Sequence, residues 1–257
     1  MRIQMDLNIY MSDIYGKEQA EVKNEILQYK IDHNLQPYKE NTTYDFVAYM
    51  FQILGFLLSV FAIVIAVEIV ISEYSNKTVK LIFCKPYRRE EIIMSKYMAV
   101  LLYVIWLVIV SFIISLITGG ILFTWHGSNV KTVIRFFHSM CQCSLLGKAM
   151  IYFAFSLVNM VIIGTIAFFL SVLFKSQVSA LIVSLGILLF GNTVAEKIDS
   201  ADFKAIKYSI LANLNPGKFV DSPVHQGYTP FIMAAVIMIH MVLLVGGIIF
   251  LIKKSDF

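Results

Sequence analysis

Long runs of apolar residues, separated by short polar and charged segments, dominate the chain. A helix needs about 20 mainly apolar residues to cross a bilayer, and five stretches reach or nearly reach that length. We predict transmembrane helices over Phe46–Ser72, Tyr97–Trp125, Ala149–Phe174, Val178–Ala195 and Phe231–Ile252. The predicted fold class is all-α: a polytopic membrane protein with five transmembrane helices in this chain, with a transmembrane domain over 46–257 and a polar segment over 1–45.

Composition supports an integral membrane protein. The chain has 257 residues, of which 58% are hydrophobic and 15% charged, against about a quarter charged in ordinary soluble domains. High hydrophobicity with a net charge of only +4 excludes a disordered chain and does not indicate a nucleic-acid binder. The three cysteines, Cys84, Cys141 and Cys143, have no disulfide-framework or zinc-finger spacing.

Charges between the apolar stretches set the expected orientation. The segment Glu73–Lys96 is rich in Lys and Arg, Lys175 lies between the third and fourth stretches, and Lys253 and Lys254 follow the last. These places fall on one side if the helices alternate, and the positive-inside rule makes that side cytoplasmic. Cations in 128–148 run against this majority. We predict a multi-pass protein of the plasma membrane, with its amino terminus outside and its carboxyl terminus in the cytoplasm.

The outer segments carry weaker signals. Residues 1–45 lack a secretory signal, so we expect that a transmembrane helix preceding them is missing from this chain; alternatively, the first span pulls them across. A modest helix is expected over Ser12–Asn34, ended by Pro37. Val130–Ser144 is amphipathic and is expected to lie in the outer interface, and Asn213–Pro230 is rich in turn residues.

Glu73–Lys96 is the most informative segment. Apolar residues stand among cations in a predicted cytoplasmic loop, namely Val79, Leu81, Ile82 and Phe83. Such a segment is best stabilised as a helix on the membrane surface or against a partner protein. The alternative is a solvated basic loop that only orients the protein. Glu90 and Glu91 are expected to open the next helix, because acids are favourable at a helix amino end.

This loop and its flanking spans resemble the permease subunits of ABC-2 type exporters. In that family a hydrophobic helix is followed by Glu, a Gly-Thr pair, an apolar stretch, Pro-x-Ser-Arg and a later Lys. The matching positions here are Glu73, Thr78, Leu81, Ile82, Phe83, Pro86, Arg89 and Lys96. Lys77 and Arg88 depart from the family pattern, replacing its Gly and Ser.

The resemblance implies a transport function. Family members have six spans, and their corresponding loop contains a coupling helix that docks on a separate ATP-binding subunit. The five spans here would be the second to sixth, and two permeases, identical or different, would form the translocation unit. No cofactor is expected in this chain, since ATP and Mg would bind the partner. A peptide, antibiotic or lipid-like substrate would be exported.

The motif inventory agrees with a non-enzymatic subunit. Neither Gly147-Lys148 nor Gly217-Lys218 is followed by the Ser or Thr of a phosphate-binding P-loop. Glu90-Glu91 invites comparison with intramembrane CAAX-type metalloproteases, but the pair lies at a predicted membrane border and its arginines precede it. A sensor or immunity protein without transport is a further alternative.

A few isolated residues have two interpretations. Glu68, near the end of the first span, could face a substrate pathway, pair with a cation or extend to water. His240 could pack in the last span or carry a proton or metal. His138, Cys141 and Cys143 could hold copper or zinc, or be unrelated interfacial residues; on a helix only the first two would share a face.

Overall fold

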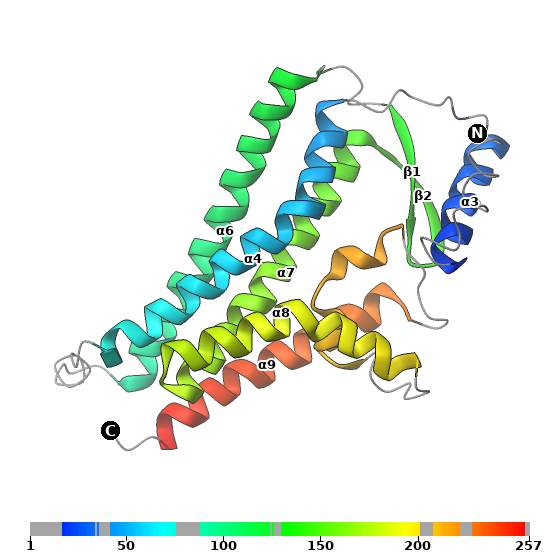
Figure 1. Cartoon of the computed structure of the whole chain (residues 1–257). Helices are drawn as coiled ribbons and strands as arrows, with labels where there is room; N and C mark the ends of the chain where they lie inside the picture. The colour runs from blue at the N-terminus through cyan, green and yellow to red at the C-terminus, as the bar shows by residue number, and fades with distance from the viewer. Residues whose placement is uncertain are drawn as a thin grey trace. The chain divides into compact units, whose positions relative to one another are not determined.

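The computed structural model describes residues 17–33, 35, 42–75, 88–123, 125, 130–200, 208–221 and 228–254, and shows a mostly helical chain with one β-hairpin (Figure 1). The elements are α3 (Lys17–Asp32), α4 (Thr43–Ser75), α6 (Arg89–Leu122), β1 (Lys131–Phe136), β2 (Ser139–Ser144), α7 (Leu145–Phe174), α8 (Gln177–Ser200), the 3₁₀ turns η2 (Leu211–Asn213) and η3 (Pro216–Phe219), and α9 (Pro230–Lys254).

Four helices are long and apolar enough to span a membrane within the described ranges: Thr43–Ser72, Glu90–Leu122, Leu145–Phe174 and Pro230–Lys254. They correspond to the first, second, third and fifth predicted spans, so the protein is a polytopic membrane protein. The fourth predicted span is also helical, but the apolar part of α8 covers only Gln177–Gly191. Polar residues beyond Gly191, among them Asn192 and Thr193, shorten it.

The all-α prediction is wrong at Val130–Ser144, which forms the antiparallel hairpin β1–β2. Phe136 pairs with Ser139 across the turn, where Phe137 has a φ of 56°. A positive φ in a two-residue turn matches the right-handed twist of the strands. β-branched residues favour a strand in β1, and Val133 and Ile134 on opposite faces are both buried.

Helix boundaries shift for local reasons. α6 begins at Arg89, so it extends before the predicted span Tyr97–Trp125, and the expectation that Glu90 and Glu91 open this helix is confirmed. Glu91 accepts a hydrogen bond from the Arg88 backbone N–H at 3.2 Å, which satisfies a donor near the helix start. α3 likewise confirms the helix expected within Ser12–Asn34.

The chain divides into two compact units. Unit 1 comprises Met1–Gln52, Ser111–Phe155 and Pro216–Ile232. Within its described part, α3 lies beside the hairpin (Figure 1), and Phe51, Phe112 and Phe153 bring parts of α4, α6 and α7 together with ring centroids 4.9–6.0 Å apart. Aromatic packing therefore forms one part of its core.

Unit 2 comprises Ile53–Val110, Ser156–Asn215 and Met233–Phe257. Its core contains fully buried apolar residues from α4, α6 and α7, such as Val67, Val104 and Phe168. α8 packs on the 3₁₀ turn η2 at Gly191, where a Cβ atom would lie 2.5 Å from Leu214 Cδ1. This unit holds the helix ends that flank the Glu73–Lys96 loop.

Candidate functional site

The ends of α4 and α6 in unit 2 are joined by a polar contact. Lys96, the closing residue of the predicted loop motif, donates from Nζ to the backbone carbonyl of Ile69 at 3.1 Å. A lysine near the end of an apolar helix places its charge at the water boundary, and here it bonds to the neighbouring helix. The two helices on either side of the loop therefore meet next to it.

Glu68, one residue before that carbonyl, is linked to α8. Its Oε2 accepts a hydrogen bond of 2.7 Å from Gln177 Nε2, at the first residue of α8. The partner is an amide, and the carboxylate is exposed.

The last turn of α9 lies at the same end of unit 2. Lys253 Nζ is 3.4 Å from Glu90 Oε1, with the two side chains 61% and 39% exposed. An exposed ion pair of this kind contributes about 0–1 kcal/mol to stability. Here it is informative because it shows which helix ends lie side by side. It places the carboxyl-terminal lysines beside the first turn of α6.

The turn between α7 and α8 completes this end. Lys175 has a φ of 50° and its backbone N–H donates to the Ser171 carbonyl at 3.1 Å. This is the left-handed cap that ends many helices, and it returns the chain into α8 within two residues. The three basic places identified from sequence thus share one end of unit 2, as helix alternation predicted.

The structure describes only the two ends of the predicted coupling loop. Glu73 lies in the last turn of α4 and Arg89 is the first residue of α6. Lys96 is brought to α4 by the bond to Ile69. The remaining predicted loop residues, Thr78, Leu81, Ile82, Phe83 and Pro86, lie outside the described residues.

Sequence reasoning missed two partners at this end. Gln177 has no charge and follows a turn directly, so only its place at the start of α8 marks it as interfacial. The pairing of Glu90 with Lys253 joins residues far apart in the sequence, and no local pattern encodes it.

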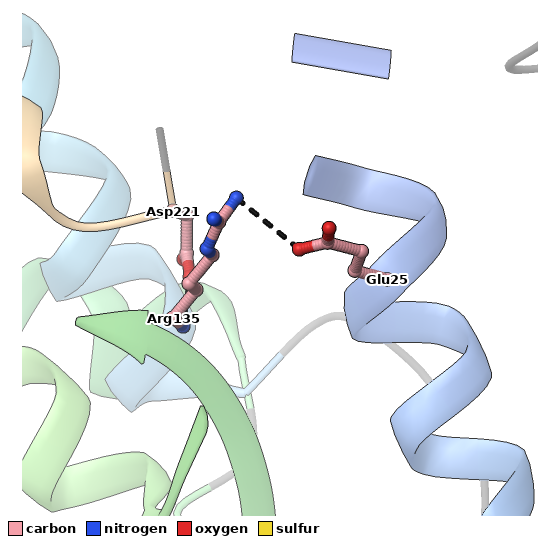
Figure 2. Close-up of polar contacts among 3 residues, drawn as sticks. All are labelled: Glu25, Arg135 and Asp221. Carbon is pink, nitrogen blue, oxygen red and sulfur yellow. Dashed lines mark hydrogen bonds and ion pairs between the residues drawn. The ribbon is translucent and has the colours of Figure 1, made fainter. Parts of the chain in front are cut away.

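A second polar cluster lies in unit 1. The Arg135 guanidinium is 3.2 Å from Glu25 Oε2 on α3 (Figure 2). The Arg135 backbone N–H donates to Asp221 Oδ1 at 2.8 Å. Burial raises the pKa of Asp221, although the hydrogen bond from Arg135 and the charge of Lys148 act in the opposite direction. Sequence analysis treated 213–230 only as turn-rich.

The three residues considered as metal ligands, His138, Cys141 and Cys143, lie in one hairpin. His138 lies in the hairpin turn, whereas Cys141 and Cys143 are alternate residues of β2 and so share a face. Among the described residues no group of three or more His, Cys, Asp or Glu could hold a metal ion. His240 Nδ1 bonds to the Val236 carbonyl of its own helix at 2.8 Å, as expected for a packing histidine.

Comparison of the chain with known proteins identifies a matching family and two relatives. A family model described as "Protein of unknown function (DUF2705)" matches residues 16–257. The "Uncharacterized protein YhcI" of Bacillus subtilis (strain 168) is 31% identical over 229 residues, which cover 86% of this chain and 72% of that protein. The "Uncharacterized membrane protein YdbK" of the same organism is 24% identical over 191 residues, which cover 74% and 73%.

Proposed function

The chain belongs to the DUF2705 family, and we propose that it is the membrane-spanning permease subunit of an ABC-2 type exporter. It moves a peptide, antibiotic or lipid-like substrate outward, using ATP hydrolysed by a separate ATP-binding subunit. A second permease, identical or different, completes the translocation unit in the plasma membrane. The proposal joins the loop motif to the contacts at the helix ends of unit 2.

The observation that carries the proposal is the bond between Lys96 and the Ile69 carbonyl, 3.1 Å long. It joins the two helices that flank the loop, six residues before the end of α4 and seven residues after the start of α6. A force applied to 76–87 by a partner therefore acts on α4 and α6 at once. The apolar loop residues Leu81, Ile82 and Phe83 supply a surface on which an ATP-binding subunit can dock.

Further contacts extend this mechanical link. Glu68 connects α4 to the start of α8 through Gln177, and Glu90 connects α6 to the end of α9 through Lys253. Closure of an ATPase dimer on the loop tilts α4 and α6, and these contacts pass the movement to α8 and α9. Movement of packed helices as rigid bodies is an established way to open and close a path.

The same contacts support a fifth crossing by α8. α8 begins at the end of unit 2 where α9 finishes, because both Gln177 and Lys253 bond to residues of that end. α9 is itself long enough to span the membrane, so the chain must cross between them. The apolar part of α8, Gln177–Gly191, is about 22 Å of helix at 1.5 Å per residue, and a span of this length is accommodated by local thinning of the bilayer.

Recruitment of an ATP-binding subunit tests the function. The tagged chain is solubilised from its native host in mild detergent, and proteins that copurify are identified by mass spectrometry. We expect the wild type to retain an ABC ATP-binding subunit. Leu81→Asp with Phe83→Asp should insert normally yet lose that subunit, because two carboxylates disrupt an apolar interface.

The matched control changes charge in the same loop without touching its apolar residues. Lys80→Ala with Lys85→Ala should retain the ATP-binding subunit, because a docking surface formed by 81–83 is unaltered. The proposal is wrong if the wild type captures no such subunit, or if the paired aspartates capture it as well as the wild type does.

A further inference from the structure

Segment 216–221 is fastened to the open edge of β1 in unit 1. The Arg135 backbone N–H donates to Asp221 Oδ1, and the Asp221 backbone N–H donates to the Arg135 carbonyl, both at 2.8 Å. Val220 forms a bridge with Phe136, and the Phe137 backbone N–H donates to the Phe219 carbonyl at 3.3 Å. Asp221 therefore occupies both backbone groups of Arg135 that point away from β2.

The backbone of Asp221 is adapted to this role. Its φ is 54°, a left-handed conformation that Asp and Asn adopt more readily than most residues. The carboxylate is held over the strand edge and is partly buried. The carboxylate oxygen that takes up a proton belongs to the same group that accepts the hydrogen bond from Arg135 on β1. In segment 216–221 this is true of Asp221 alone.

We propose that Asp221 is a proton-sensitive clamp, which fastens segment 216–221 to β1 more firmly in acidic than in neutral or alkaline medium. An ionised carboxylate at this position carries the cost of burial. A protonated carboxyl keeps one oxygen free to accept the Arg135 N–H bond and removes that cost. The attachment therefore survives protonation and becomes more stable.

The sign follows from linkage. Burial raises the pKa of Asp221 in the closed clamp, so the closed state binds a proton more tightly than an open, solvated state. The closed state therefore gains stability as pH falls through this raised pKa and loses it as pH rises again. This is the reverse of a salt-bridged Asp, whose pKa is lowered on folding.

Within the described ranges, groups on α3, β1, β2 and α7 act on this carboxyl. Lys30 on α3, Lys148 on α7 and the Arg135 backbone lower its pKa without overcoming burial, while Cys143 on β2 and Tyr152 on α7 lie within its electrostatic reach. Lys218 of its own segment lies over the Phe219 ring, 5.5 Å from the centroid. Figure 2 shows the Arg135 guanidinium directed at Glu25, 3.2 Å away, so Arg135 presents its backbone to Asp221.

Hydrogen exchange in the full chain, reconstituted in lipid nanodiscs, tests the clamp without reference to the exporter function. Protection factors, which are ratios of intrinsic to observed exchange rates, are measured from pH 8 down to pH 3.5 for peptides covering Arg135 and 217–221, so that the series passes below 3.8, the ordinary pKa of an aspartate. In the wild type we expect protection to rise as pH falls, by up to about tenfold per pH unit, the limit for one proton. Asp221→Asn keeps an acceptor oxygen without a charge and should show high protection at every pH.

Two further variants keep the test decisive. Asp45→Asn, an acid elsewhere in unit 1, should keep the wild-type pH dependence. Lys148→Gln removes a cation that lowers the pKa of Asp221, so the rise in protection should begin at a higher pH. A flat profile in the wild type, or a wild-type profile in Asp221→Asn, would overturn the clamp, whether or not an ATP-binding subunit is recruited.

Discussion

Two pairs of polar side chains inside the apolar helices of unit 2 connect neighbouring helices. The Ser59 hydroxyl on α4 is hydrogen-bonded to the Asn159 side chain on α7 at 3.2 Å, and Tyr97 Oη on α6 lies 3.0 Å from Thr165 Oγ1 on α7. Thr165 in turn donates to the Val161 carbonyl at 2.7 Å. The first pair joins α7 to α4 and the second joins α7 to α6. These hydrogen bonds define how the helices are aligned along their axes more strictly than apolar packing alone would.

The Ser59–Asn159 pair should contribute measurably to stability. Asn159→Leu removes the interhelical bond, and we expect unfolding to become easier by about 0.6–2 kcal/mol, the range found for hydrogen bonds between membrane helices. Chemical unfolding in mixed micelles measures the change. Ser59→Ala should cost a similar amount, and the double variant should cost little more than either; fully additive losses would show that the two residues act separately.

The cysteines of β2 should differ in reactivity. Burial raises the pKa of Cys143, while the charge of Lys148 lowers it and that of Asp221 raises it. Because the thiolate is the reactive form, alkylation of Cys143 should reach half its maximal rate at a higher pH than a free thiol such as N-acetylcysteine. Asp221→Asn should shift this midpoint down and Lys148→Gln should shift it up.

A chain in which Cys84 and Cys141 are both replaced by Ser gives the clearest measurement of this midpoint. Identical midpoints in the two charge variants would contradict the electrostatic assignment. The exposed Cys141, studied alone in the same way, serves as the reference for accessibility.

At the scale of elements, the apolar helices could be read from sequence, whereas the hairpin could not. Helices such as α4 and α7 are continuous apolar runs, whose length alone predicts a span. Val130–Ser144 mixes apolar and polar residues with no clear period, and its turn is Phe137-His138 rather than the Asn-Gly or Asp-Gly that would signal a hairpin. Tertiary contacts hold the turn instead, since the Phe137 ring stacks on Phe219, 5.2 Å away.

The packing of α8 on η2 predicts a steric effect. A Cβ at Gly191 would lie 2.5 Å from Leu214 Cδ1, and Leu214 is only 2% exposed, so it has little room to move. We expect Gly191→Val to destabilise the protein by about 1–3 kcal/mol, as overpacking does. The shift in thermal unfolding midpoint in detergent measures it.

Gly186 on the same helix is the matched control, because no atom lies within 4 Å of a Cβ built there. Gly186→Val should leave stability within about 0.5 kcal/mol of wild type, as expected away from packed contacts. Equal losses at both positions would show that valine lowers helix stability in general and that the contact with Leu214 is unimportant.

For the whole molecule, charge distribution predicted which segments share an end, and long-range contacts agree. Lys175 follows α7, while Lys96 and Lys253 bond to α4 and α6. No sequence pattern predicts the Glu25–Arg135 or Arg135–Asp221 contacts, because these pairs join segments separated by entire spans. The sequence shows that these residues lie in polar segments outside the predicted spans, but their interaction partners are determined by the tertiary structure.

The native cysteines allow the proposed orientation to be tested directly. Cys84 lies in the predicted cytoplasmic loop, and Cys141 is exposed on the hairpin that joins α6 to α7. If α6 crosses the membrane, as its length allows, the two thiols face opposite sides. In intact cells, a membrane-impermeant maleimide should label a chain that retains only Cys141 and spare one that retains only Cys84. Both chains should be labelled after permeabilisation. If a bound partner protects Cys84 from the reagent, a cysteine introduced by Lys80→Cys reports on the same loop. Labelling of the Cys84 chain in intact cells would place the loop outside, where no ATP-driven subunit could act on it, and the exporter proposal would be wrong.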